Sequence, residues 1–526
     1  MSKNHFLTVD AGTGSVRAVL FDLEGNQTAC VQQEWDHKED PRYPGSMDFN
    51  WEYNWKLTCG CIKGVLEQSG ISPDDIAAIS TTCMREGIVL YDKDEHEIWA
   101  CANVDARSTD EVSQLRKAYP GLEQELYLES GQTYALDALP RLLWVRNKMP
   151  DVYEKIAYVG MFNDWLIHKM TGILAVEPSN GSTTGLFSLK NRSWDSSIAR
   201  RCGLRTDMFP EVRECGSRAG TVTAQCEEQT GLAQGTPVIV GGGDAQLGCI
   251  GVGVVRPNQA AVFGGSFWQY EYNTADGRTD EECRVRVNCH AVPNVWQYEA
   301  LAFKPGLVMR WFRDGFCQAE KEIAKLKGTD PYDVMNEYAK DIAAGSYGMM
   351  CVFSDVMNFI NWKHASPTFT NFELDPVRFS KYTFYRAILE NTAMVTKGHL
   401  DLVREATGNQ PEDIIFAGGA SKSPLWCQIL SDVLGLPVKV PAVKEATALG
   451  AAILAGCGVG IYKDMSEAAE KLVKWDTTYV PDSANHQLYC EMYEQWRSVY
   501  KASLNLCSQN LTRSMWAAPG LSLIHI

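Results

Sequence analysis

The sequence lacks the features that mark secreted, membrane-spanning and zinc-binding proteins. No two of its 17 cysteines form a Cys-x-x-Cys pair, and neither Cys59-x-Cys61 nor Cys283 with Cys289-His290 matches zinc spacing. We therefore expect reduced, mostly buried thiols. No run approaches the roughly 18 apolar residues that span a bilayer, and the first residues lead into a strand without the apolar region of a signal peptide. These absences predict a cytoplasmic protein with no membrane partner.

Positive charge is also scarce. The chain has 49 Lys and Arg against 65 Asp and Glu, for a net charge of −16. This balance argues against a nucleic-acid partner, which would need a basic patch, but local arginines or a metal can still bind a phosphorylated small molecule. With 45% hydrophobic and 22% charged residues, the composition is that of a globular protein. At 526 residues the chain is too long for one core, so we expect two domains.

The segment Asp10-Ala-Gly-Thr-Gly-Ser-Val-Arg17 lies between the apolar runs Phe6–Val9 and Val19–Phe21. Two strands joined by small residues predict a β-hairpin. Its tip offers backbone N–H groups and hydroxyls that can surround a phosphate, and Asp10 is placed to hold Mg²⁺ through water. An ordinary glycine turn with a capping Asp explains the same residues equally well.

A second candidate site is Gly241-Gly-Gly-Asp244, at the end of a predicted buried strand. Asp244 can accept a proton from an attacking hydroxyl, as phosphoryl transfer to an alcohol requires; alternatively it only caps a helix from Ala245. A second small-residue hairpin follows at Gln259–Tyr272 and predicts duplicated α/β domains facing one cleft. We place these domains at residues 1–252 and 253–520, and interpret residues 521–526 as a non-native cloning scar.

Three further motifs are ambiguous by themselves. Phe416-Ala-Gly-Gly419, before a helix predicted from Pro424, can lay a flat face against an adenine or simply form a tight turn. Arg85-Glu86 can hold a polyol by charge-assisted hydrogen bonds or form a surface ion pair. The small residues of Glu445–Gly456 predict a helix that packs closely against a neighbour. Strands and helices alternate throughout, which indicates an α/β fold.

Together and in this order, these motifs resemble the FGGY carbohydrate kinases of the actin-like ATPase superfamily, over residues 6–520. The resemblance implies an α/β fold of two duplicated actin-like (ribonuclease H-like) ATPase domains around a central cleft. It also implies ATP and Mg²⁺ as cofactors, a small polyol or ketone substrate, and no nucleic-acid partner. Members of the family are often dimers, and some respond to a sugar-phosphotransferase-system regulator, so a homodimer and such a regulator are the protein partners to expect.

The resemblance assigns roles by motif. Asp244 becomes the general base and Asp10 the residue that organises Mg²⁺. The phosphates are surrounded by Thr13, Gly14, Ser15 and Arg17 from one domain and by Gly264, Gly265 and Ser266 from the other. Gly418 and Gly419 back the adenosine. Arg85 and Glu86 hold substrate hydroxyls, with Gln246 and Trp268 as wall residues.

A narrower resemblance extends over Cys83–Tyr91, Ile98–Arg107, Gly241–Cys249 and the ending Trp516–Gly520. These segments are similar to the bacterial branch of the family that phosphorylates the quorum-sensing signal autoinducer-2. The implied substrate is linear 4,5-dihydroxy-2,3-pentanedione, phosphorylated on its 5-hydroxyl. One alternative is a kinase of the same fold for glycerol, xylulose or ribulose. Another, of a different class, is a non-catalytic actin-like nucleotide-binding module.

Overall fold

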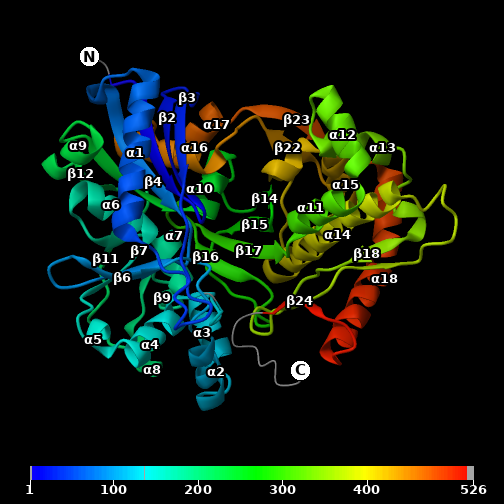
Figure 1. The fold of residues 1–526 in the computed structure, drawn as a ribbon, viewed down its shortest axis with the longest axis horizontal. Helices are drawn as coiled ribbons and strands as arrows, with labels where there is room; N and C mark the ends of the chain where they lie inside the picture. The colour runs from blue at the N-terminus through cyan, green and yellow to red at the C-terminus, as the bar shows by residue number, and fades with distance from the viewer. Residues whose placement is uncertain (1–2, 136, 518–526) are drawn as a thin grey trace. The chain divides into compact units, whose positions relative to one another are not determined.

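The computed structural model describes residues 3–135 and 137–517, which form two compact units (Figure 1). The first unit contains the chain up to Pro257 together with Asn273–Gln297 and Val443–Val473. The second contains Asn258–Tyr272, Tyr298–Ala442 and the described residues from Lys474 on. Two later segments thus pack with the first unit, and the domain boundary expected after residue 252 stays a prediction. The expected non-native tail, 521–526, lies outside the described residues.

The first unit is built on a sheet with strand order β12-β13-β4-β1-β2-β3. Its strands are β1 (His5–Ala11), β2 (Ser15–Asp22), β3 (Gln27–Glu34), β4 (Ile76–Cys83), β12 (Arg218–Thr221) and β13 (Pro237–Gly243). The predicted hairpin is confirmed: β1 and β2 pair antiparallel, with Asp10 opposite Arg17. Strand β4 runs parallel to both β1 and β13, so the ends of β1 and β13, which carry Asp10 and lead into Asp244, lie at the same edge of the sheet.

Alternation along the strands sends side chains to two different helical layers. Leu7 and Val9 belong to a core shared with α1 (Trp51–Ser69) and α6 (Phe162–Thr171). Phe6 belongs to a second core, shared with α10 (Asp244–Gly251) and α16 (Ala446–Gly458). Asp10 lies four residues after Phe6 on the same strand, so both side chains lie on the same face of the sheet. The Asp10 side chain therefore points toward the layer formed by α10 and α16. Figure 1 shows α16, in orange, beside the blue strands from the start of the chain.

Smaller elements complete the first unit. A second sheet has the order β6-β5-β7, formed by β5 (Ile88–Tyr91), β6 (Glu97–Cys101) and β7 (Tyr158–Met161). Further elements are α2 (Thr109–Ala118), α3 (Leu122–Ser130), α4 (Ala138–Lys148), α7 (Pro178–Gly181), α9 (Ala224–Thr230), β16 (Arg286–Cys289) and α17 (Met465–Leu472).

The second unit repeats the architecture of the first. Its sheet contains the strand order β17-β15-β14-β21-β22-β23, formed by β17 (Trp296–Ala302), β15 (Trp268–Thr274), β14 (Ala260–Gly264), β21 (Ile414–Ala417), β22 (Val438–Pro441) and β23 (Trp475–Tyr479). An antiparallel hairpin, β14–β15, is followed by the parallel strands β21 and β22 and an antiparallel edge strand, β23. The first unit has the same sequence of pairings, which confirms the expected duplication of one α/β fold.

Helices surround this second sheet. They are α11 (Pro305–Phe316), α12 (Gln318–Lys327), α13 (Pro331–Ala339), α14 (Lys381–Thr407), α15 (Pro424–Leu434) and α18 (Ser483–Ser508). Helix α15 begins after Ser423, whose side chain accepts a hydrogen bond from Trp426 N, and ends at Gly435 with φ +66°. Both ends agree with the helix predicted from Ser423-Pro424 and Gly435.

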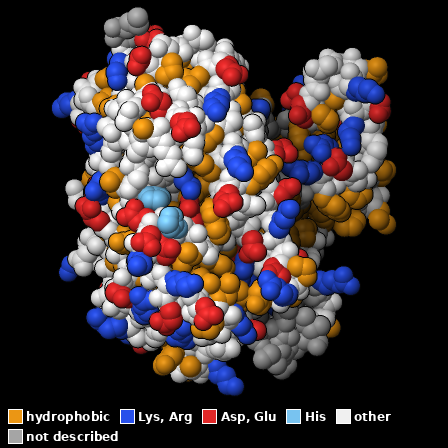
Figure 2. All heavy atoms as spheres, turned by 60° about the vertical axis from the view of Figure 1, so that its left-hand side comes forward, with side chains coloured by type: hydrophobic (Ala, Val, Ile, Leu, Met, Phe, Trp, Pro, Cys, Tyr) orange, Lys and Arg blue, Asp and Glu red, His pale blue; other side chains and the backbone are white. Residues whose placement is uncertain are grey.

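The cysteines and surface charges agree with a globular protein that has reduced thiols. All the cysteines are free thiols and most are buried, as expected; burial raises the pKa of Cys59 to about 12, so this thiol stays protonated. Figure 2 shows acidic and basic side chains interspersed over the face it displays. Across residues 3–135 and 137–517, none of the helices combines the length and the apolar character needed to cross a membrane.

Candidate functional site

Asp244 is the first residue of α10, directly after the strand β13. Its Oδ1 accepts hydrogen bonds from Ala245 N at 2.8 Å and from Arg85 Nε at 3.3 Å. The Asp244 side chain is 45% exposed, whereas Arg85 is 5% exposed. The carboxylate is therefore anchored through one oxygen by a buried cation while the group as a whole still faces an open space. Asp244 is at the helix start, as the capping alternative proposed, but it is also accessible to a substrate.

The glycines before Asp244 are required by the protein's own chain. A Cβ at Gly241 would lie 1.6 Å from the carbonyl oxygen of Thr81 in β4. One at Gly243 would lie 2.8 Å from Arg85 Cγ. The turn is approached closely by β4 and by the Arg85 side chain.

Glu86 is buried in a hydrogen-bond network whose other members lie far from it in the sequence. Its backbone is left-handed at φ +64°, a conformation that costs a non-glycine residue about 1–3 kcal/mol. The Arg141 guanidinium donates to its carbonyl oxygen, and Arg286 Nη1 donates to its Oε1 at 2.9 Å. Arg286 Nε also donates to Gln132 Oε1 at 2.9 Å. The surface ion pair considered for this motif is wrong, because Arg85 and Glu86 are both buried.

The charge state of Glu86 follows from this network. Burial raises the pKa of its carboxyl, but the guanidinium groups of Arg286 and Arg85 outweigh burial and hold the pKa below its usual value. Glu86 is therefore an ionised hydrogen-bond acceptor next to the residue that holds Asp244. A carboxylate and a guanidinium in one buried wall can bind vicinal oxygens of a small polar molecule.

Asp10 lies in a second cluster of charges. Its Oδ2 is 3.4 Å from Arg17 Nε, and Arg17 Nη1 donates to Glu445 Oε2 at 2.5 Å. Burial raises the pKa of Asp10 to about 7, with the negative charges of Asp244 and Glu445 adding to the effect and Arg17 opposing it. Arg17, expected beside the phosphates, is held by carboxylates. Glu445, interpreted only as part of a helix start, contributes charge to the site.

The tip of the first hairpin is accessible. Thr13 and Gly14 are exposed and Ser15 is half-buried. Thr13 Oγ1 accepts a hydrogen bond from Asn103 Nδ2 at 3.0 Å, and its carbonyl oxygen accepts one from Trp35 Nε1 at 3.2 Å. The tip is thus fixed at Thr13 while its small residues stay open to a ligand.

The two expected wall residues differ in placement. Gln246 is buried in α10 and its Nε2 donates to Gln297 Oε1 at 2.9 Å, so it supports the helix that carries Asp244. Trp268 is fully buried in the second unit. It donates from Nε1 to Thr396 Oγ1 at 3.0 Å and packs on Phe416. Because its ring is enclosed in this core, the structure does not support a substrate-wall role for Trp268.

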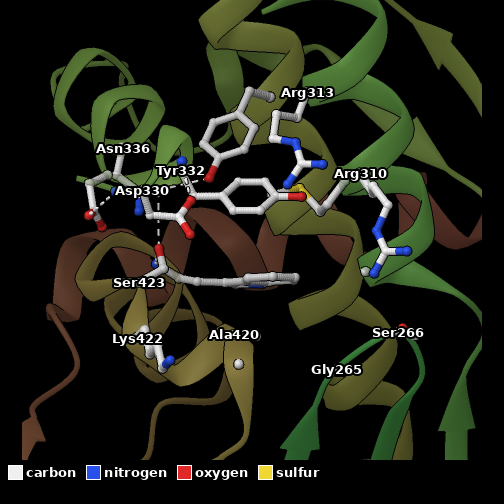
Figure 3. Close-up of a pocket in the computed structure, with 16 residues that line it drawn as sticks. Gly265, Ser266, Arg310, Arg313, Asp330, Tyr332, Asn336, Ala420, Lys422 and Ser423 are labelled. Carbon is white, nitrogen blue, oxygen red and sulfur yellow. Dashed lines mark hydrogen bonds between the residues drawn. The ribbon is translucent and has the colours of Figure 1, made fainter. Parts of the chain in front are cut away.

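The second unit contains a pocket of about 460 Å³ at the ends of β14 and β21 (Figure 3). Two of the predicted nucleotide-binding segments meet there: Gly265 and Ser266 from the hairpin, and Gly419 from the turn after β21. The remaining walls carry cationic, aromatic and polar side chains, among them Arg310, Arg313, Lys422, Tyr332, Tyr385, Trp426, Asn336 and Ser423. In Figure 3 the Tyr332 ring extends across the pocket toward Arg310. Lys422 and Ser423 directly follow the turn at Gly418 and Gly419, and Arg310 and Arg313 lie in α11, but none of these side chains was assigned to the nucleotide from the sequence.

Close backbone approach shapes this pocket. Gly418 has φ +92°, and a Cβ there would lie 2.6 Å from the carbonyl oxygen of Gly264. A Cβ at Gly306 would lie 2.0 Å from the carbonyl oxygen of Gly265. Gly264 and Gly418 therefore bring the two segments together, while Gly265 and Gly419 line the space. Cations, aromatic rings and exposed backbone suit a ligand that combines phosphates with a flat base.

The duplicated fold agrees with a family of kinases that both halves of the chain match. Residues 5–251 match the N-terminal domain, and residues 277–459 the C-terminal domain, of the FGGY family of carbohydrate kinases. The chain belongs to this family, and it is a phosphotransferase that uses ATP and an alcohol acceptor. Among curated proteins it is 49% identical to the autoinducer-2 kinase of Escherichia coli (strain K12) over 521 residues, which is 99% of this chain and 98% of that protein. It is also 49% identical to the autoinducer-2 kinase of Klebsiella pneumoniae, over 98% of each chain.

Solved structures share the fold. The xylulose kinase from Rhodospirillum rubrum aligns with a TM-score of 0.82 and 22% identity, over 95% of this chain and 98% of that one. The Plasmodium falciparum glycerol kinase with ADP has the same TM-score and coverage at 18% identity. These likenesses confirm the expected architecture, and at such identities they speak to the fold alone.

Proposed function

We propose that this kinase phosphorylates autoinducer-2, in its linear form 4,5-dihydroxy-2,3-pentanedione, on the 5-hydroxyl, in the cytoplasm. Near-complete alignment at 49% identity with curated autoinducer-2 kinases supports this choice of acceptor. The observation that carries the chemistry is the anchored, half-exposed Asp244 beside the buried Arg85 and Glu86. A substrate with adjacent carbonyl and hydroxyl oxygens matches the donors and acceptors of this wall.

The proposed reaction uses Asp244 as the general base. The primary hydroxyl donates its proton to the Asp244 carboxylate as its oxygen forms a bond to the γ-phosphorus of ATP and the bond to the β-phosphate oxygen breaks. Arg85 fixes the direction of the carboxylate through Oδ1. Glu86, ionised and held by Arg286, accepts a hydrogen bond from the one remaining hydroxyl, on carbon 4, and so orients the 5-hydroxyl.

Asp10 fits a magnesium site. Its buried carboxyl has a pKa raised to about 7 because burial is joined by the negative charges of Asp244 and Glu445, against the single cation Arg17. A divalent cation would neutralise this excess of negative charge. When bound, Mg²⁺ supplies positive charge to the phosphate oxygens. Asp10 would hold it, with the hairpin tip at Thr13–Ser15 next to the phosphates.

We propose that the pocket of the second unit binds the nucleotide. Ser266 offers its backbone N–H and its hydroxyl to phosphates, next to Gly265, whose own N–H donates to Phe267 O within the turn, and Lys422 adds a positive charge. The aromatic rings of Tyr332 and Trp426 offer flat surfaces to adenine. The pocket places Gly419, which was expected to back the adenosine, among basic and aromatic side chains that complete a binding site for the nucleotide.

Mass spectrometry of the purified enzyme with Mg·ATP and single acceptors tests the proposal. We expect a phosphorylated pentanedione carrying phosphate on its 5-hydroxyl, formed faster than the products of glycerol, xylulose or ribulose. Preference for xylulose or another polyol would reassign the acceptor within the family. Slow ATP hydrolysis that no acceptor accelerates would instead indicate the nucleotide-binding module.

A further inference from the structure

A buried hydrogen-bond chain ends on the residue before Asp244. Ser179 Oγ accepts a hydrogen bond from Gly243 N at 2.9 Å and donates one to Glu177 Oε2 at 2.6 Å. Ser179 and Glu177 are both fully buried. We propose that Ser179, oriented by Glu177, is a positioning residue that holds the general base in place. This inference rests on the role of Asp244 under the proposed function.

Gly243 is the point where Asp244 most needs an external support. It is the last residue of β13 and the N-cap of α10, and it has no side chain to pack. Gly243 pairs with Cys83 of β4 on one side, and the hydrogen bond from Gly243 N to Ser179 Oγ constrains it from another. The two contacts together set the direction in which α10 and its first side chain begin. A displacement of about 1 Å at a reacting group can cost about 10²-fold in rate.

Glu177 fixes the direction of the Ser179 hydroxyl proton. The carboxylate accepts hydrogen bonds from Ser179 N at 2.6 Å, Asn180 N at 3.1 Å, Asn180 Nδ2 at 2.5 Å and Cys215 Sγ at 3.1 Å, besides Ser179 Oγ. Because the hydroxyl proton points to Glu177, a lone pair of Oγ faces Gly243 N. Glu177 thus makes Ser179 an acceptor toward the turn, and the pair acts on Asp244 through the backbone.

The chain offers a matched control at Ser182. This serine is also fully buried, and its Oγ likewise accepts a backbone hydrogen bond at 2.9 Å, from Cys289 N; it donates to the carbonyl oxygen of Ser179 at 3.2 Å and leaves the Ser179 hydroxyl untouched. Ser179→Ala and Ser182→Ala remove the same group from neighbouring positions, but only the first reaches Gly243. We expect both variants to lose similar thermal stability.

Steady-state kinetics of the two variants with the pentanedione and Mg·ATP separate positioning from stability. We expect Ser179→Ala to lower kcat about 10- to 100-fold, with KM for ATP within about twofold, while Ser182→Ala keeps kcat within about twofold. Glu177→Gln should lower kcat like Ser179→Ala, because an amide nitrogen would face hydrogen-bond donors. Equal kcat in Ser179→Ala and Ser182→Ala would overturn the positioning role.

A second route avoids dependence on the folding of Ser179→Ala. A Cβ at Gly242 would lie 2.9 Å from Ser179 Oγ, so Gly242→Ala should displace the hydroxyl from Gly243 N and lower kcat in the same way. A Gly242→Ala enzyme with unchanged kcat would contradict the inference. The role of Asp244 is tested separately: an inactive Asp244→Asn enzyme together with an unaffected Ser179→Ala enzyme rejects the positioning role alone, whereas an active Asp244→Asn enzyme rejects the proposed base.

Discussion

The substitution Asp244→Asn tests the proposed chemistry most directly. The amide keeps the size of the side chain, and its oxygen can still accept the hydrogen bonds from Ala245 N and Arg85 Nε, but it cannot take up the hydroxyl proton. A positioned general base contributes about 10²–10⁴-fold to the rate, which corresponds to about 2.7–5.5 kcal/mol of activation free energy. We expect kcat to fall by that factor. KM for ATP should stay within about twofold, because no residue of the proposed nucleotide pocket changes.

The same substitution should leave the fold intact. Arg85 is buried, but it keeps a hydrogen bond to the amide oxygen and the nearby charge of Glu86. Because the side chain at position 244 is 45% exposed and screened by water, losing its charge costs about 1 kcal/mol. In the opposite direction, one of the negative charges that raise the pKa of Asp10 disappears. Since the two effects oppose each other, we expect the free energy of unfolding in urea to change by less than about 1 kcal/mol.

Asp48→Asn is a matched control for this experiment. Asp48 is 46% exposed and pairs with Arg107, which is 2% exposed, so the substitution removes the same kind of ion pair outside the proposed machinery. ADP release with Mg·ATP and the pentanedione should continue at about the wild-type rate in this variant. If Asp244→Asn retains more than about a tenth of the wild-type kcat, the carboxylate is not the base. If both variants lose activity equally, the loss comes from breaking an arginine–carboxylate pair and the reasoning fails.

Three further substitutions probe the surroundings of the two sites. Burial, with Asp244 and Glu445 adding to it, raises the pKa of Asp10 from 3.8 to about 7, so its ionisation costs the folded protein stability as pH rises from about 4 to 7; Asp10→Asn should therefore raise the free energy of unfolding by up to about 4 kcal/mol at pH 8, and by less at pH 5, in urea titrations with EDTA. Equal gains at both pH values would refute the sign of this shift. Arg286→Met leaves Glu86 buried without its cation, so we expect a loss of about 3–5 kcal/mol in unfolding free energy and a higher KM for the acceptor but not for ATP; an unchanged acceptor KM would separate Glu86 from substrate binding. Lys422→Met should raise KM for ATP about 10-fold or more through a lost charged hydrogen bond, and an unchanged KM would remove Lys422 from the phosphate site.

Local signals predicted the architecture because hairpins and helix ends are local structures. The segment around Asp10 alternates apolar residues and turns on glycine, and these features specify β1 and β2 without distant contacts. The same holds for the second hairpin and for α15, between Ser423 and Gly435. The order of strands in each unit was not predictable from local signals, since pairing between β14 and β21 joins segments about 150 residues apart in the sequence.

The side chains that complete the sites were not predictable in this way. Arg286 stands in an ordinary alternating strand, and its partners Glu86 and Gln132 lie more than 150 residues earlier. Arg286 was missed, whereas Trp268 was wrongly included among the substrate-binding residues because it lies close to the turn of the second hairpin. The alternation of side chains along β15 does not show which face of the strand is covered by the core. Phe267, the neighbour of Trp268, is exposed, while Trp268 is enclosed. Burial on one face or the other is decided by packing across the whole unit.

The environments of Asp10 and Asp244 explain how one chemical group can take two roles in a kinase. Asp10 is buried and faces other carboxylates, and its pKa near 7 shows that this environment disfavours its charge until a cation is supplied. Asp244 is open to solvent on one side and is held in one direction by a buried guanidinium. A buried carboxylate among other carboxylates suits cation binding, and an accessible, oriented one suits contact with the hydroxyl of a neutral alcohol. The difference comes from the strand parity that buries Asp10 and from the helix start that exposes Asp244. For this reason the two aspartates should not exchange roles, even though both lie at the same edge of one sheet.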